Sequence, residues 1–131
     1  MEFALSEDQR LLQSSMMGVL STASSLDEVR KVAAGEAGVA LSISVALSEL
    51  GAAQLRVPEA YGGLGLGALE AVLVQDALGA HVSPANFMAG SVMAAEAINL
   101  AGDEAQKADW LGQIAGGDKH CLLYTSDAAD E

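Results

Sequence analysis

Few side chains with catalytic or metal-binding chemistry stand at a productive spacing in this sequence. His81 and His120 are its only histidines and Cys121 is its only cysteine, so a metal site would have to be built from carboxylates alone. A G-x-S-x-G sequence, which would present a nucleophilic serine, does not occur. The acidic residues are scattered, and no two of them form a recognisable acid–base pair. The sequence therefore predicts no metal site and no catalytic residue in this chain.

The glycine-rich segment G-G-L-G-L-G at residues 62–67 is the motif with the closest likeness to a phosphate cradle. A dinucleotide-binding fingerprint requires the spacing G-x-G-x-x-G between a strand and a helix. The spacing here is G-G-x-G-x-G, and no convincing strand precedes it. We therefore interpret the segment as a tight connection that lets two helices approach closely, and a phosphate-binding loop as the weaker alternative.

Charge and composition exclude several classes of function. The net charge of -12 disfavours binding to nucleic acid or to an anionic membrane, because both need basic groups. Hydrophobic residues make up 51% of the chain, enough for a folded core, and only 4% of residues are aromatic. The first ten residues lack the pattern of a signal peptide, and the most apolar stretch, residues 39–55, is interrupted by polar residues. We expect a cytoplasmic, all-α protein.

The elements that must position any site are helices. Ser6 with Gln9, Ser25 with Glu28, and Asp103 with Gln106 each resemble a cap at the start of a helix. Gly35 and Gly38 are expected to break the second helix, Gly51 to end the third, and His81 to end the fourth. The alternation in residues 41–45 also fits a strand, but the longer pattern favours a helix. Six helical segments are predicted, over residues 5–24, 25–34, 39–51, 68–80, 85–102 and 103–117.

Three stretches, in order, resemble the N-terminal domain of acyl-CoA dehydrogenases. They are MEFALSEDQRLL at residues 1–12, LRVPEAYGGLGLGALEAVLVQDALGAHVSP at residues 55–84, and AGDEAQKADWLGQIAGGDK at residues 101–119. The resemblance covers about residues 1–119 and departs from the family at Ala60, where Glu is usual, and at Gly112, where Pro is common. It implies an N-terminal bundle of about six helices.

The resemblance implies a flavoenzyme of three domains that removes hydrogen from the α and β carbons of an acyl-CoA thioester. FAD would be held mainly between the middle and C-terminal domains, and the C-terminal domain would carry the catalytic glutamate. The expected partners are the acyl-CoA substrate and an electron-transfer flavoprotein. The enzyme is expected to be a homo- or hetero-oligomer that binds neither nucleic acid nor membrane. Fatty acyl chains, dicarboxylates and steroid side chains all remain open as substrates.

The contribution of this domain, by the same resemblance, is one wall of the acyl pocket. The residues implied to bind the substrate are Phe87, Gly90 and Met93, whose small or flexible apolar character suits an alkyl chain. Ordinary packing within the helix is the alternative for each of them. The turn at residues 61–65 is a further candidate for the border of the pocket. We expect the chain alone to be inactive and to hold no FAD tightly.

The C-terminal segment CLLYTSDAADE, residues 121–131, does not continue the resemblance. In the family, a segment like A-L-T-E-P should begin the flavin-binding barrel at this point. The codons that can encode the segment match a transposase adapter used in sequencing libraries, so residues 120–131 are expected to be a non-native tail after a domain of residues 1–119. The alternatives for the tail are a divergent native terminus and a true truncation with a coincidental tail. The alternative for function is a non-catalytic helical interaction module or subunit of the same ancestry.

Overall fold

The computed structural model describes residues 4–117 and contains no strand within them. The all-α prediction is therefore confirmed for this part of the chain. Its elements are the α-helices α1 (Glu7–Ala23), α2 (Leu26–Ala33), α3 (Ala37–Glu49), α4 (Ala68–Ala80), α5 (Ala95–Ala101) and α6 (Glu104–Ala115), the 3-10 turn η1 (Glu59–Tyr61) and the π-helix η2 (Phe87–Ala94). The expected tail and His120 lie outside the described residues.

The predicted caps are present at three helix starts. The Ser6 hydroxyl accepts a hydrogen bond from the Gln9 amide, and the Gln9 side chain accepts one from the Ser6 amide. Asp103 and Gln106 make the same reciprocal pair before α6. Ser25 accepts from the Glu28 amide before α2. Each pair satisfies backbone N–H groups that the first helical turn leaves without partners, which fixes where the helix begins.

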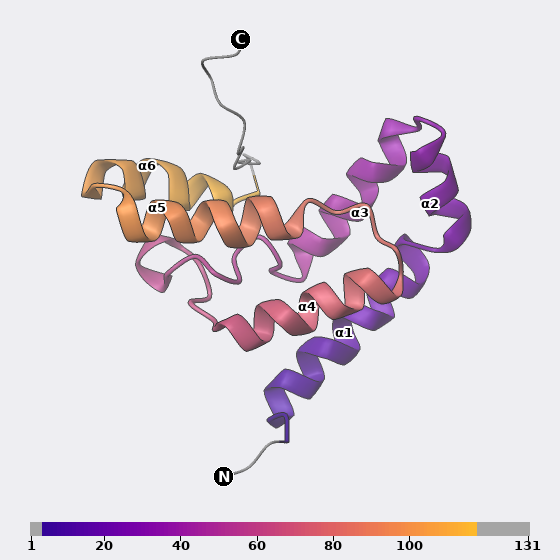
Figure 1. The fold of residues 1–131 in the computed structure, drawn as a ribbon, viewed down its shortest axis with the longest axis horizontal. Helices are drawn as coiled ribbons and strands as arrows, with labels where there is room; N and C mark the ends of the chain where they lie inside the picture. The colour runs from indigo at the N-terminus through magenta and orange to yellow at the C-terminus, as the bar shows by residue number, and fades with distance from the viewer. Residues whose placement is uncertain (1–3, 118–131) are drawn as a thin grey trace.

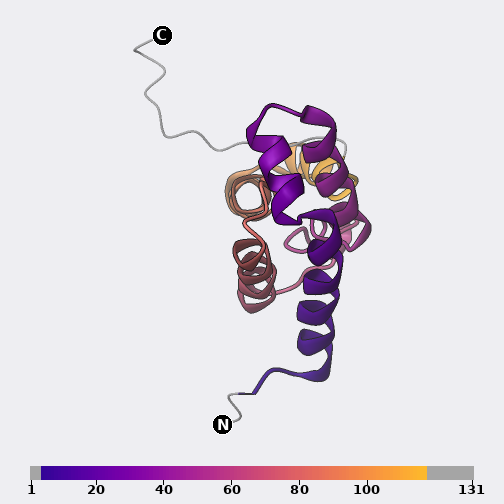
Figure 2. The ribbon, with the colours of Figure 1, turned by 90° about the vertical axis from the view of Figure 1, so that its right-hand side faces the viewer.

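Two hydrophobic clusters hold the helices together. In the first, α1 packs across α3 and α4 (Figure 1), and Met16, Ile43 and Val74 are at most 1% exposed. In the second, α6 packs against α5 and η1 around Val57 and Leu111. Figure 1 and Figure 2 both show that α1 begins beside the N-terminus at one end of the molecule and that the α2–α3 pair lies toward the other end. Loop residues 50–67 connect the two clusters, because Leu55 belongs to the first and Val57 to the second.

The third helix matches its prediction except at its start. Residues 41–45 are helical rather than extended, and Gly51 follows the helix with φ of 79°. Gly38, which we expected to break the second helix, instead lies inside α3, and Gly35 alone makes the break with φ of 94°. A glycine lowers helix propensity by only about 1 kcal/mol, so the burial of Ile43 and Leu47 outweighs it.

The predicted long helix over residues 85–102 is divided. Its first half is the π-helix η2 and its second half is α5. Hydrogen bonds in a π-helix join residues five apart, which widens each turn. Gly90 and Ser91 lie in this stretch, and both have a weaker intrinsic preference for α-helix than alanine or leucine, so the stretch departs from α winding more easily. Such stretches occur often at functional sites.

Candidate functional site

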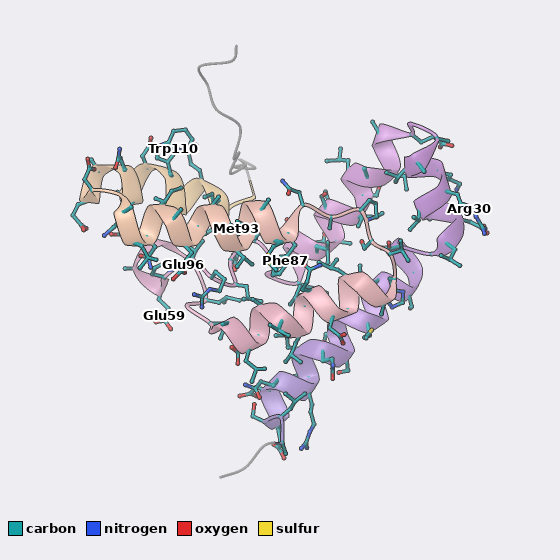
Figure 3. All side chains as sticks on the ribbon, in the orientation of Figure 1. Arg30, Glu59, Phe87, Met93, Glu96 and Trp110 are labelled. Carbon is teal, nitrogen blue, oxygen red and sulfur yellow. The ribbon has the colours of Figure 1, made fainter. Side chains whose placement is uncertain are left out.

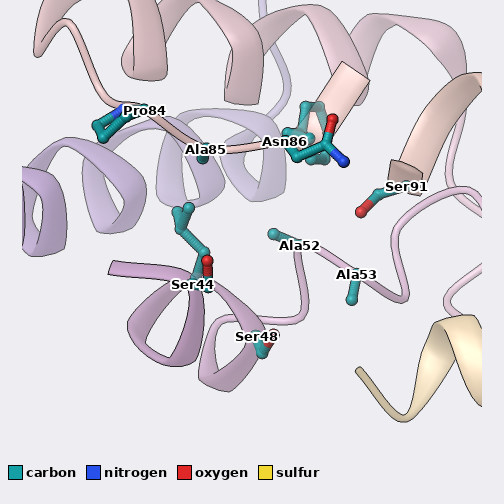
Figure 4. A pocket seen from close by; sticks show the side chains of 10 residues that line it. Ser44, Ser48, Ala52, Ala53, Pro84, Ala85, Asn86 and Ser91 are labelled. Carbon is teal, nitrogen blue, oxygen red and sulfur yellow. The ribbon is translucent and has the colours of Figure 1, made fainter. Parts of the chain in front are cut away.

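A cavity of about 270 Å³ lies between α3 and the chain that leads into η2 (Figure 4). One side comes from α3 and the turn after it, and the other comes from the residues just before η2 and from η2 itself. None of the side chains that line it is ionisable, and four carry a hydroxyl or carboxamide group. The lining residues are Ser44, Leu47, Ser48, Ala52, Ala53, Pro84, Ala85, Asn86, Phe87 and Ser91.

The three residues predicted to bind substrate all lie in η2, but on different sides of it. Phe87 is 3% exposed, lines the cavity and belongs to the first hydrophobic cluster. Gly90 is buried, whereas Met93 is 44% exposed (Figure 3). Phe87 and Met93 are six residues apart, which places them about 120° apart around an ideal α-helix, and the wider π turn does not bring them onto one face. The structure therefore brings Phe87 to the cavity and places Met93 on another surface.

The glycine-rich loop is closed by its own backbone. The amides of Gly62, Gly63 and Gly65 donate to the carbonyls of Glu59, Pro58 and Val57. These N–H groups are therefore committed within the loop and are not presented to a phosphate. A Cβ on Gly63 would lie 1.9 Å from the Val57 carbonyl oxygen, so only glycine fits there. The interpretation as a tight connection holds, although the close contact is within the loop rather than between two helices.

The turn at residues 61–65 does not line the α3–η2 cavity. Tyr61 packs instead against the second hydrophobic cluster, beside α6. Its hydroxyl and Glu104 Oε2 are 3.1 Å apart in a hydrogen bond. Burial, helped by that hydrogen bond to Glu104, raises the pKa of the Tyr61 hydroxyl. The tyrosine therefore stays protonated and anchors η1 to α6.

Arg56 fixes the loop to the helix that follows η2. Its Nη1 donates to the Leu66 carbonyl at 2.7 Å, and its Nη2 donates to Glu96 Oε2 at 2.8 Å. Only 20% of the Arg56 side chain and 33% of the Glu96 side chain are exposed. Charge-assisted hydrogen bonds of this kind are about twice as strong as neutral ones. Because α5 continues η2 directly, this pair fixes the position of η2 relative to the loop.

A second polar link joins α1 to the start of α4. The Gln9 side-chain amide donates to Glu70 Oε1 at 2.8 Å, and the Gly67 amide donates to Glu70 Oε2 at 2.9 Å. The Gln9 hydrogen bond is the main reason that the pKa of the Glu70 carboxyl is lowered. His81 lies at the C-terminal end of α4, as predicted. These carboxylate and imidazole groups serve helix ends and do not converge on a reaction site.

Sequence reasoning missed the polar lining of the cavity. Ser44 and Ser48 are four residues apart on α3, a spacing that places both on one face. That spacing was available as a signal, but the partner residues Asn86 and Ser91 come from a distant segment. Within residues 4–117, no group of three His, Cys, Asp or Glu side chains could hold a metal ion. No helix in the same part of the chain is both long and apolar enough to span a membrane.

Comparison with known proteins identifies the domain. The family model described as acyl-CoA dehydrogenase, N-terminal domain, matches residues 6–118. The chain is also similar to a (2S)-methylsuccinyl-CoA dehydrogenase of Cereibacter sphaeroides, with 36% identity over 81 residues. That alignment covers 61% of this chain and 15% of the relative, so the chain spans only a small part of the relative's length. No solved structure matches the chain.

Proposed function

The chain belongs to the acyl-CoA dehydrogenase family, as its N-terminal domain, and from that premise we propose that it is part of a flavin-dependent enzyme that dehydrogenates an acyl-CoA thioester between its α and β carbons. The observation that carries the proposal is the family match over residues 6–118, nearly all of the part that the structure describes. An electron-transfer flavoprotein is the proposed acceptor of electrons from the enzyme, which we propose to be oligomeric.

The proposed role of the domain is to supply one wall of the acyl-binding pocket through η2. Phe87 is packed into the first hydrophobic cluster, which holds η2 in position. Met88 and Met93 are 41% and 44% exposed, so their flexible apolar side chains are available to contact a substrate or an adjoining domain. Gly90 adds no bulk between them. Isolated exposed apolar residues are common, and what singles out these two is their place on a π-helix.

The described residues do not fit FAD. The lining of the α3–η2 cavity has no lysine or arginine that could pair with the pyrophosphate of FAD. The amides of the glycine-rich loop are bonded within the loop and are not free for a pyrophosphate. We propose that FAD is held by parts of the enzyme outside residues 4–117, and that the chain alone is inactive. A purified 131-residue product that retains visible flavin absorbance would contradict this.

The experiment that tests the function uses the gene continued beyond codon 119 from the source DNA. The product is expressed with FAD and supplied with acyl-CoA esters of several chain lengths and an artificial electron acceptor. We expect acceptor reduction that depends on acyl-CoA. No reduction with any ester, from a product that is folded and carries flavin, would refute the dehydrogenase assignment.

Two variants in that product test the role of η2. Met93→Trp should raise KM for the longer acyl chains, because the larger ring would occupy space along the proposed wall. Leu100→Trp is the matched control, since Leu100 is 76% exposed and lies on α5, beyond the end of η2. Equal KM values for the two variants would show that Met93 does not form part of the wall, and would leave the dehydrogenase assignment unaffected.

A further inference from the structure

The serines of the α3–η2 cavity make no side-chain hydrogen bond to the described protein, as is also true of Ser15 on α1. Ser14, Ser21 and Ser42 each donate to a carbonyl three or four residues earlier in their own helix. This is the usual way in which a serine inside a helix satisfies its hydroxyl. The hydroxyls of the cavity do not do this, although their residues are also helical.

Four hydrogen-bonding side chains of the cavity have no protein partner among the described residues and are open to a ligand or to water. Ser44, Ser48 and Ser91 make no side-chain hydrogen bond within the described residues, and neither does Asn86. Figure 4 shows Ser44 and Ser48 on α3 across the cavity from Asn86 and Ser91. Three hydroxyls and one carboxamide can together donate and accept several hydrogen bonds. They surround an apolar floor that includes Leu47 and Phe87, both at most 5% exposed.

The charge of a suitable ligand follows from the lining. None of the ten lining residues is ionisable, so a carboxylate, phosphate or ammonium group would lose hydration without gaining a counter-charge. The net charge of -12 further disfavours an anion. The volume of about 270 Å³ suits a small ligand or the end of a longer one. The chemistry that fits is a short aliphatic chain with a neutral amide or hydroxyl group.

We propose that the cavity between α3 and η2 is a binding site for an uncharged aliphatic ligand that carries an amide or hydroxyl group. Its apolar part contacts Leu47 and Phe87, and its polar group bonds to the hydroxyls of Ser44, Ser48 and Ser91 and to the Asn86 carboxamide. The site does not depend on the proposed dehydrogenase activity, because all of its residues lie in this chain.

The test is a titration of the ¹⁵N-labelled 131-residue chain with hexanamide, followed by two-dimensional NMR. We expect saturable shifts confined to α3, the turn after it, and the start of η2. Hexanoate, the charged analogue of the same length, should bind at least about tenfold more weakly at neutral pH, because its carboxylate would be desolvated without a partner. Equal binding of the two probes, or no saturation with hexanamide, would overturn the proposal.

Substitutions locate the site. Ser44→Leu fills the cavity and should weaken hexanamide at least about tenfold, whereas Ser42→Leu, on the exposed side of the same helix, should leave it unchanged. If Ser44→Leu does not fold, Ser91→Ala removes one hydroxyl without adding volume and should weaken binding several-fold. Hexanamide affinity that is the same in the cavity variants and in Ser42→Leu would place the binding elsewhere and refute the proposed site.

Discussion

Replacing Gly63 with alanine should destabilise the domain through a single atom. The added Cβ would lie 1.9 Å from the Val57 carbonyl oxygen and 2.5 Å from the Val57 Cβ. No rotamer change relieves these contacts, because one partner is backbone and the other is attached to it. Val57 is fully buried in the second hydrophobic cluster, so it cannot move without disturbing α6. The loop must therefore open.

The loss of stability in Gly63→Ala follows from the hydrogen bonds that break when the loop opens. The Gly65 amide to the Val57 carbonyl and the Leu64 amide to the Gln54 carbonyl are both 2.9 Å hydrogen bonds that close the loop. Each contributes about 1 kcal/mol net. Partial exposure of Val57 adds about 1 kcal/mol, since full exposure of such a side chain costs roughly 1.5–3 kcal/mol. We expect the free energy of unfolding to fall by about 2–4 kcal/mol.

Denaturation in urea, followed by circular dichroism, measures this change against two control glycines. Gly62 has φ of 82° but no atom within 4 Å of an added Cβ, so Gly62→Ala should cost about 1 kcal/mol from backbone strain alone. Gly112 lies inside α6 with only an ordinary contact at 3.9 Å, so Gly112→Ala should stabilise by up to about 1 kcal/mol. If Gly63→Ala lies within about 0.5 kcal/mol of the unsubstituted chain, or costs less than Gly62→Ala, the close packing of the loop is wrong.

Three further predictions concern the links that surround the site. Arg56→Met keeps the aliphatic stem but leaves Glu96 and the Leu66 carbonyl without their donor, so the free energy of unfolding in urea should fall by about 1–3 kcal/mol. The Arg56→Met/Glu96→Gln double variant should lose less than the sum of the losses of the two single variants. Additive costs would mean that the pair does not interact. The folded-state pKa of Glu70 is lowered from 4.5 by Gln9, so its contribution to stability is present above about pH 4.5 and lost as pH falls below that value. Glu70→Gln should therefore lose less stability than the unsubstituted chain on acidification, and an unchanged pH profile would contradict this. Val82 is a β-branched residue with φ of 50° and is 61% exposed. Val82→Gly should therefore raise the free energy of unfolding by about 1 kcal/mol, because it relieves backbone strain. A free energy of unfolding below that of the unsubstituted chain would show that the Val82 side chain stabilises the fold more than its backbone strain destabilises it.

The features that were predictable from sequence are those set by neighbouring residues. The caps at Ser6 and Asp103 depend on a partner three positions away, and that partner is visible in the sequence. The end of α3 at Gly51 depends on one residue that tolerates positive φ. These local signals locate most of the helix boundaries.

The features that were missed depend on distant residues or on packing. The π winding of η2 was missed, because residues 85–102 have the pattern of one continuous helix and no motif in them specifies π turns. The cavity joins residues 44–53 to residues 84–91, and nothing in either segment alone indicates the other. Gly63 was recognised as part of a turn, but the contact with Val57 that requires glycine appears only in three dimensions.

We propose that this domain belongs to an enzyme that oxidises acyl-CoA. This proposal is tested most directly by the rate at which the product of the gene, continued beyond codon 119, reduces an electron acceptor when an acyl-CoA is added. We predict acyl-CoA-dependent reduction by that flavin-containing product and none by the 131-residue chain. A folded, flavin-containing product that reduces no acceptor with any acyl-CoA, or a native gene that reads CLLYTSDAADE and then stops, would contradict the account.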